Sequence, residues 1–233
     1  MKLLLKSVAN HWRRRFGPYV VWIDGAKVDI RHISSLSVRL HLLKGHYQRE
    51  ERSLLDFAVV DGDSVVELGV GIGLLGLIAA RLAGPSGRVF SCSFNTASEN
   101  IARRNYTINE ISPKLVPISV GQDVQDHFPS APCGSRNLKS NTTEFSGMLD
   151  AVVSNELSSV LDQFRPNVLL VDLRGYENGF FRFDPLNEVQ RILVKIHPKI
   201  LGLKRCQELE VLLVEKGFYV FGRMGDSVLF KRV

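Results

Sequence analysis

The sequence has few of the residues that build disulfide frameworks or zinc sites. Its 233 residues include three cysteines, Cys92, Cys133 and Cys206, which are far apart and form no CxxC pair. An odd, scattered set of this kind favours a reducing compartment, so we expect a cytoplasmic protein. No Cys/His spacing typical of zinc is present, and we predict no metal site. No apolar run reaches transmembrane length, and the leading LLL is too short for the core of a signal peptide.

Positive charge is concentrated near the N-terminus. The first 60 residues hold 11 Lys and Arg against 5 Asp and Glu, whereas the remainder holds 19 of each class. The stretch HWRRRF, at 11–16, mixes aromatic and basic residues, as nucleic-acid or membrane-surface patches do. A single cluster of this kind is more typical of a solvated helix face.

Strand-like and helical patterns alternate along most of the chain. The run YVVWIDGAKVDI, at 19–30, places Asp-Gly between two β-rich segments and predicts a hairpin. Residues 35–58 are predicted to be helical, with Gly45 as a potential break, and Thr96 or Ser98 is expected to cap a helix after the second strand. The alternation predicts an α/β fold with a mostly parallel sheet and helices on both faces.

The most informative stretch is VVELGVGIGLLGLIAA, at 65–80. A strand ending at an acid is followed by three alternating glycines and then a helix. The first such loop of a parallel sheet is a usual place for a nucleotide-like ligand. A P-loop would need Gly-Lys-Ser/Thr, which is absent, and the dinucleotide fingerprint GxGxxG would place Leu74 at its third glycine. The spacing in ELGVGIG fits an S-adenosylmethionine loop without a gap.

Several motifs resemble those of FkbM-type methyltransferases, over roughly residues 17–222. GHYQ is similar to the family's Gly-x-Tyr-Glu segment, GDSVVELGVGIGLLGLIAA to its glycine loop, and VDLRGYE to its D-V-E-G-x-E signature. The resemblance implies a class I methyltransferase (Rossmann-like) fold and O-methylation of hydroxyls on small molecules, sugars or glycans. We expect a basic helix, hairpin and cap at 1–58, and an S-adenosylmethionine-binding methyltransferase domain at 59–233.

The loop pattern and the resemblance together predict a set of site residues. Glu67 is expected to reach the methionine ammonium, directly or through water, and Ser93 stands where the family has its ribose-binding acid, with Asn95 as a substitute. The predicted cofactor residues are Glu67, Gly69, Gly71, Gly73, Ser93 and Asn95. The catalytic candidates are Asp172, Glu177 and His46, with His197 as a further possible base. The substrate-binding candidates are Tyr47, Arg174 and Lys195.

Departures from the family pattern keep other functions open. Arg174 and Lys195 stand where the family has acids, and they could bind an acidic substrate. Together with Ser93, they also fit a catalytically silent binding module. The segment LDAVVSNEL, at 149–157, resembles a strand motif of nucleic-acid methyltransferases and, with the basic N-terminus, keeps RNA or DNA as an alternative acceptor. Asp172 and Glu177 could hold a divalent ion, without a full ligand set. The oligomeric state cannot be predicted.

Overall fold

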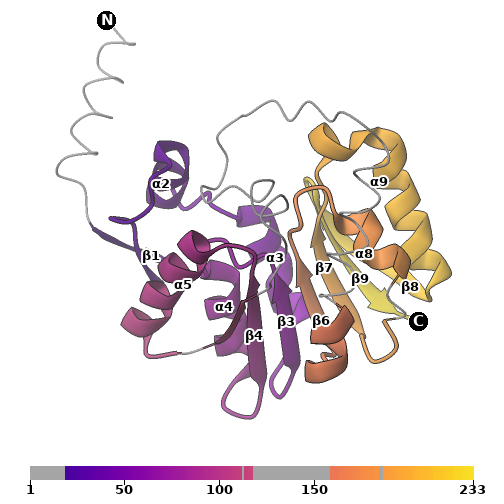
Figure 1. The fold of residues 1–233 in the computed structure, drawn as a ribbon, viewed down its shortest axis with the longest axis horizontal. Coiled ribbons are helices and arrows are strands. Elements are labelled where there is room, and N and C mark those ends of the chain that lie inside the picture. The colour runs from indigo at the N-terminus through magenta and orange to yellow at the C-terminus, as the bar shows by residue number, and fades with distance from the viewer. Residues whose placement is uncertain (1–18, 112, 118–157, 184–185) are drawn as a thin grey trace, which may run out of the picture.

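The structure, a computed structural model, describes residues 19–111, 113–117, 158–183 and 186–233. In this part of the chain a seven-stranded sheet has the order β5-β4-β3-β6-β7-β9-β8 (Figure 1). The strands are β3 (Ser64–Leu68), β4 (Arg88–Ser93), β5 (Lys114–Pro117), β6 (Val168–Val171), β7 (Arg191–Lys195), β8 (Phe218–Met224) and β9 (Ser227–Arg232). The strands from β5 to β7 are parallel, and β9 and β8 pair antiparallel at one edge. This arrangement confirms the predicted class I methyltransferase fold.

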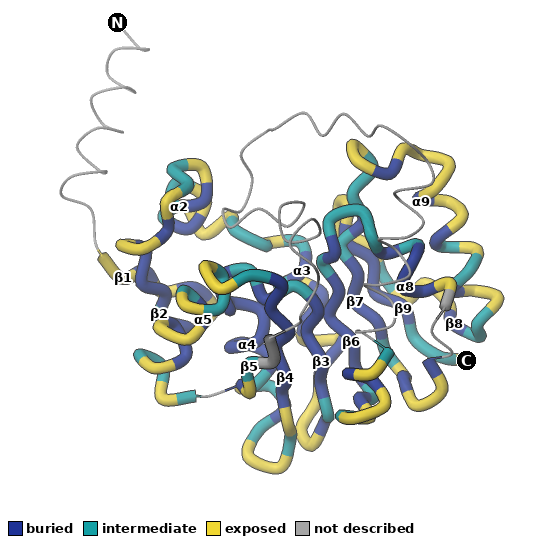
Figure 2. The backbone as a smooth tube through the Cα atoms, in the orientation of Figure 1, coloured by how far each residue is buried: buried dark blue, intermediate teal, exposed yellow. Residues whose placement is uncertain are grey.

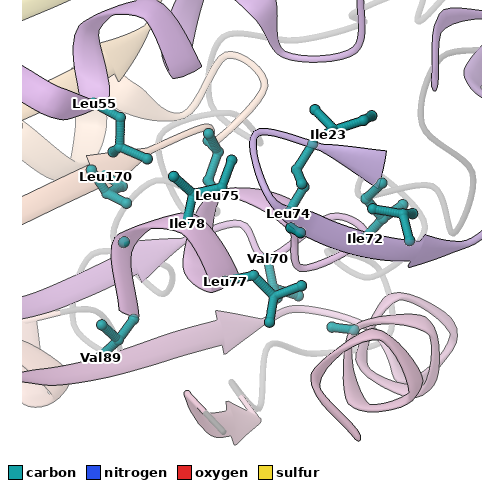
Figure 3. Packing of buried hydrophobic residues seen from close by; sticks show 14 of the residues in the cluster. Ile23, Leu55, Val70, Ile72, Leu74, Leu75, Leu77, Ile78, Val89 and Leu170 are labelled. Carbon is teal, nitrogen blue, oxygen red and sulfur yellow. The ribbon is translucent and has the colours of Figure 1, made fainter. Parts of the chain in front are cut away.

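Helices cover both faces of the sheet. One face packs against α3 (Arg49–Ala58), α4 (Leu74–Ala83) and α5 (Thr96–Asn109), and the other against residues 158–164, α8 (Glu177–Phe183) and α9 (Pro198–Glu215). Because side chains alternate along a strand, Val65 faces the first layer and Val66 the second. Strands β3, β6, β7 and β9 are buried along most of their length, whereas the edge strand β8 is largely exposed (Figure 2). The apolar side chains of α4, among them Leu74 and Leu77, fill the space above the sheet (Figure 3). No helix in the described ranges is long and apolar enough to span a bilayer.

The predicted helical stretch over 35–58 forms two helices, and the interruption includes Gly45, the potential break in the prediction. Helix α2 (Leu36–Leu43) begins after Ser35, whose side chain accepts a hydrogen bond from the Val38 amide. Gly45, with φ +68°, and Gln48, with φ +48°, turn the chain before α3 begins. Glycine adopts such a left-handed conformation readily, whereas glutamine does so at a cost in free energy.

The predicted N-terminal hairpin is confirmed. Strands β1 (Val20–Ile23) and β2 (Ala26–Asp29) pair antiparallel around Asp24 and Gly25, which both have positive φ, as a type I′ turn requires. Two asparagines of α5 attach this hairpin. The Asn109 side chain bonds both the amide and the carbonyl of Lys27, at 2.8 and 2.7 Å. Asn105 accepts from the Asp29 amide and donates to the Ile72 carbonyl, both at 2.8 Å. The predicted basic helix at the N-terminus lies outside the described residues.

A buried polar cluster lies between β3, β4 and α4. Glu67 pairs in register with Ser91, whose hydroxyl donates to Glu67 Oε2 at 2.5 Å and accepts from the Tyr106 hydroxyl at 3.0 Å. Gly76 makes room for this cluster, because a Cβ there would lie 2.5 Å from Glu67 Oε2. Burial raises the pKa of Glu67 to about 8, although Ser91 and the Gly76 amide favour the charged form. Glu67 is therefore mostly protonated at neutral pH.

Substitution of Asn105 should loosen the hairpin and the glycine loop together. Asn105→Ala leaves the Asp29 amide and the Ile72 carbonyl without partners in a buried environment. We expect a loss of about 2–4 kcal/mol in the free energy of unfolding, measured by urea denaturation. Asn100→Ala, at an exposed position of the same helix, is the control and should change stability by less than about 0.5 kcal/mol. Equal stability of the two variants would contradict this role.

Substitution of Glu67 should change how stability depends on pH. Between about pH 5 and pH 8 the unfolded chain releases the Glu67 proton and the folded chain retains it, so the wild type loses stability as the pH rises. Glu67→Gln removes this effect. Over this pH range, the free energy of unfolding of Glu67→Gln should rise relative to that of the wild type by up to about 1.4 kcal/mol per pH unit. Glu215→Gln, at an exposed position, should follow the wild type. Parallel pH profiles for Glu67→Gln and the wild type would disprove the buried protonated state.

Candidate cofactor and active site

A polar hollow lies at the carboxyl ends of β3, β4 and β6. Its walls are Tyr47, Gln48, Gly69, Val70, Gly71, Ser93, Phe94, Asn95, Ser98, Asp172 and Arg174. The chain passes from β3 to β4 on one side and returns to β6 on the other, so the hollow is at a topological switch point, where α/β folds bind their ligands.

The hollow is narrow. Its volume is about 40 Å³, well below that of ordinary ligand pockets. Tyr47 lies across the glycine loop, with its hydroxyl 3.4 Å from the point where a Cβ on Gly71 would be. The space in the structure is therefore smaller than a nucleoside needs, and Tyr47 is one of the residues that limit it.

The three alternating glycines are required for different physical reasons. A side chain on Gly69 would collide with the backbone carbonyl of Asp172 at the end of β6. A Cβ on Gly73 would lie 2.7 Å from the ring of Tyr106, so this glycine permits close packing of α5 and does not line the hollow. Gly71, with φ +53°, lines the hollow and faces Tyr47. Among the three, Gly71 is the one whose missing side chain leaves room for a ligand.

Ser93 and Asn95 line the end of the hollow beside β4. The Ser93 hydroxyl donates to the Asn95 carbonyl at 2.8 Å, and Asn95 Oδ1 accepts from the Ser98 amide at 2.8 Å. Asn95 is thus the N-cap of α5, and the prediction of Thr96 or Ser98 at this position is wrong. The described lining residues supply hydroxyl, amide and backbone groups at this end, without a carboxylate. The ribose role of Ser93 and Asn95 remains a prediction.

Asp172 and His197 form a hydrogen-bonded pair at the ends of the adjacent strands β6 and β7. Nε2 of His197 donates to Asp172 Oδ1 at 2.8 Å. Burial disfavours the charged form of each group, but the hydrogen bond and the mutual attraction are stronger in effect. They lower the pKa of Asp172 and raise the pKa of His197. The site therefore holds an ionised carboxylate beside an imidazole that keeps its proton to a higher pH than an ordinary histidine does.

Glu177 shapes the loop after β6. Its two carboxylate oxygens accept from the amides of Leu173, at 3.2 Å, and Gly175, at 2.8 Å, and its side chain is fully buried. Burial raises the pKa of Glu177 to about 7, although the charge of His197 opposes the rise. Glu177 does not line the hollow, and its catalytic role remains a prediction.

Donor atoms of Asp172, Glu177 and His197 lie within 4.8 Å of one another, a separation that a metal ion could bridge. His197 Nε2 lies 2.8 Å from Asp172 and 3.7 Å from Glu177, and backbone amides bond both Glu177 oxygens. An ion pair and backbone hydrogen bonds therefore account for the cluster without a metal.

The remaining predicted residues divide into two groups. Tyr47 and Arg174 line the hollow. His46 is exposed and does not line it. Lys195 is also absent from the walls, because its ammonium pairs with Glu50 at 2.8 Å and with Glu51 at 3.3 Å, two acids in the first turn of α3.

Glu67 does not line the hollow either. It lies one position before the end of β3 and faces the α4 layer, so its carboxyl group is buried beneath Gly76 of α4. Contact of this carboxyl group with a cofactor ammonium remains a prediction.

The sequence reasoning missed Gln48, Val70, Phe94 and Ser98 as lining residues. Val70 and Phe94 follow directly from their position at the ends of β3 and β4 and could have been found. The left-handed backbone at Gln48 has no sequence signal.

A larger hollow of about 460 Å³ lies between α8 and α9, lined by Asn178, Arg182, Lys204, Gln207, Glu208, Val211, Leu212 and Glu215. It contains none of the strand-end residues, and its charged groups are on solvent-exposed helix positions typical of a surface. The smaller hollow has the convergent loops and polar groups of a binding site, so it is the stronger candidate despite its volume.

No protein-family model matches the chain, and no curated protein matches it in sequence. Solved structures resemble it in fold. Precorrin-6y C5,15-methyltransferase from Geobacter metallireducens GS-15 has a TM-score of 0.48 and 12% identity, covering 93% of this chain and 100% of that one. Aeropyrum pernix fibrillarin with bound S-adenosyl-L-methionine has a TM-score of 0.44 and 14% identity, covering 94% and 83%. A SAM-dependent methyltransferase from Aquifex aeolicus has a TM-score of 0.42 and 14% identity, covering 78% and 89%. Likeness at this level concerns the fold alone.

Proposed function

We propose that this protein is an S-adenosylmethionine-dependent methyltransferase that methylates a hydroxyl group of a small molecule, sugar or glycan. The observation that carries the proposal is the hollow at the switch point, where Gly71 faces Tyr47 between two polar walls. One wall offers Ser93 and Asn95, and the other offers the ionised Asp172.

The residues of the hollow fit the two chemical halves of the cofactor. The Ser93 hydroxyl can accept hydrogen bonds from ribose while it donates to the Asn95 carbonyl. Phe94 supplies an apolar surface beside it. Gly71 lets the ligand approach the backbone closely. At the other end, Gln48, Asp172 and Arg174 offer polar groups of both charge types.

When bound, the cofactor would supply a methyl group on a positively charged sulfur. Transfer to an acceptor oxygen then depends mainly on how the chain positions the two partners. Asp172 can accept a hydrogen bond from an acceptor hydroxyl and withdraw its proton, while His197 holds the carboxylate in place. Glu177 supports this arrangement through the loop it folds. Tyr47 covers the loop and would exclude water.

Cofactor binding is tested by a substitution that fills the hollow. Gly71→Arg places a long side chain where Gly71 faces Tyr47, so affinity for S-adenosylhomocysteine should fall on the order of 100-fold or more in calorimetric titration. Gly202→Arg is the matched control, because Gly202 also has positive φ and has open space around it on α9. The control also places a side chain on a backbone with positive φ, and it should keep wild-type affinity.

Two results would count against the proposal. Wild-type affinity in Gly71→Arg would remove the glycine loop from the binding site. A wild-type protein that binds neither S-adenosylmethionine nor S-adenosylhomocysteine at millimolar concentration would support the silent module instead.

The Asp172–His197 pair predicts a specific titration. In the wild type, NMR signals of the His197 imidazole should titrate above the usual histidine pKa, and in Asp172→Asn the His197 pKa should fall because the ionised partner is lost. The other five histidines serve as internal references in the same spectra. The pair stabilises the fold below the unfolded-state pKa of histidine, and this contribution disappears as the pH rises through the higher folded-state pKa. An unchanged His197 titration in Asp172→Asn would exclude the pair.

A further inference from the structure

Two non-glycine residues with left-handed backbone line the same hollow. Gln48, with φ +48°, precedes α3, and Arg174, with φ +50°, follows β6. Such a conformation costs free energy in a residue with a side chain, and residues held in it gather at functional sites. The two positions come from distant parts of the chain, so one local turn does not account for both.

The polar ends of these two side chains lack protein partners. Gln48 Oε1 is buried and accepts no hydrogen bond, and the Gln48 side chain does not cap α3. Within the described part of the chain, the Arg174 guanidinium makes no hydrogen bond or ion pair. A buried amide oxygen without a donor costs free energy, which a ligand with a suitable donor would recover.

Neighbouring cations at the same sheet edge differ from Arg174 in this respect. Lys195 pairs with Glu50 and Glu51, and His197 pairs with Asp172. Their charges are therefore compensated by direct ion pairs, whereas Arg174 lines the hollow near the Asp172 carboxylate without a direct ion pair in the described part of the chain. The planar guanidinium group favours carboxylates, which it can bind through two parallel hydrogen bonds.

An acceptor oxygen and a guanidinium group in one hollow match the two charges of an α-amino acid. The oxygen of Gln48 can accept from an ammonium group, and Arg174 can donate to a carboxylate. The hollow extends from Ser93 and Asn95, across the glycine loop, to Arg174. A cofactor with its ribose near Ser93 would place its amino-acid half at the opposite end.

We propose that Gln48 and Arg174 bind the amino-acid half of the cofactor, with Gln48 at its ammonium group and Arg174 at its carboxylate. This inference rests on the proposed function. It gives the ammonium group a partner other than Glu67, whose carboxyl group is 2% exposed and lies beneath α4.

Calorimetric titration with paired ligands tests the carboxylate contact. S-adenosylhomocysteine carries the amino-acid half, and 5′-methylthioadenosine lacks it. Arg174→Gln should weaken binding of S-adenosylhomocysteine by roughly 10-fold or more and leave binding of 5′-methylthioadenosine unchanged. Arg104→Gln, at an exposed position of α5, has the same change in net charge and should leave the affinity ratio of the two ligands as in the wild type.

The ammonium contact has its own test. Gln48→Gly keeps a residue that accepts the left-handed backbone and removes the amide oxygen. It should weaken binding of S-adenosylhomocysteine and leave binding of its deaminated analogue unchanged. Calorimetric titration of the wild type and the variant with both ligands measures the four affinities, and these form a double-mutant cycle between the side chain and the amino group.

The outcomes separate this inference from the proposed function. If the wild type binds both paired ligands and Arg174→Gln keeps their affinity ratio, or weakens both equally, the inference is wrong and the proposed function stands. If the wild type binds neither ligand, both the proposed function and the inference fail. Loss of the preference for S-adenosylhomocysteine in Arg174→Gln alone supports the inference.

Discussion

The position of the glycine loop depends on hydrogen bonds that hold the ends of three parallel strands together. The amides of Gly69 and Val70 donate to the Cys92 carbonyl of β4, at 3.2 and 3.1 Å, and the Asp172 amide after β6 donates to the Leu68 carbonyl at 2.9 Å. A side chain at Gly69 would collide with the Asp172 backbone, so these contacts require a glycine there. The loop is therefore fixed on both sides, and the separation between the β4 wall and the β6 wall of the hollow is set by the sheet.

Contacts with α5 and the N-terminal hairpin also hold the glycine loop in place. Asn105 joins the Ile72 carbonyl to the Asp29 amide of the N-terminal hairpin, and the missing side chain of Gly73 allows Tyr106 and Ala102 of α5 to pack against the loop. The hairpin, α5 and the loop thus form one packed unit. A segment before the sheet therefore helps to position the backbone of the glycine loop at the sheet edge.

Local patterns predicted the fold well, since they depend on interactions between near neighbours. The Asp24–Gly25 turn, the helix that ends at Gly84 and the alternation of strands and helices all follow from such interactions. The site was less predictable because it depends on contacts between distant segments. The pairing of Asp172 with His197 requires the adjacency of β6 and β7, and the pairing of Lys195 with Glu50 requires α3 to pack beside β7. The burial of Glu67 could have been predicted, because the two-residue period of β3 places it on the same face as Val65, toward α4.

The three departures from the FkbM pattern have different physical consequences. Lys195 is positive where the resemblance implies an acid. Glu50 and Glu51 compensate its charge within the fold, so it changes the electrostatic potential in the hollow less than an unpaired lysine would. Ser93 offers a neutral hydrogen-bond acceptor where the resemblance implies a charged one, so the proposed ribose contact would be weaker than with a carboxylate. Arg174 brings a positive charge to the same walls as the Asp172 carboxylate. A decayed site would be expected to lose its polar groups or fill with side chains, whereas this one keeps Asp172 ionised and holds two residues in a costly backbone conformation. These features are the ones that the proposed ligand site requires, with Arg174 as the residue proposed to meet the carboxylate of the ligand.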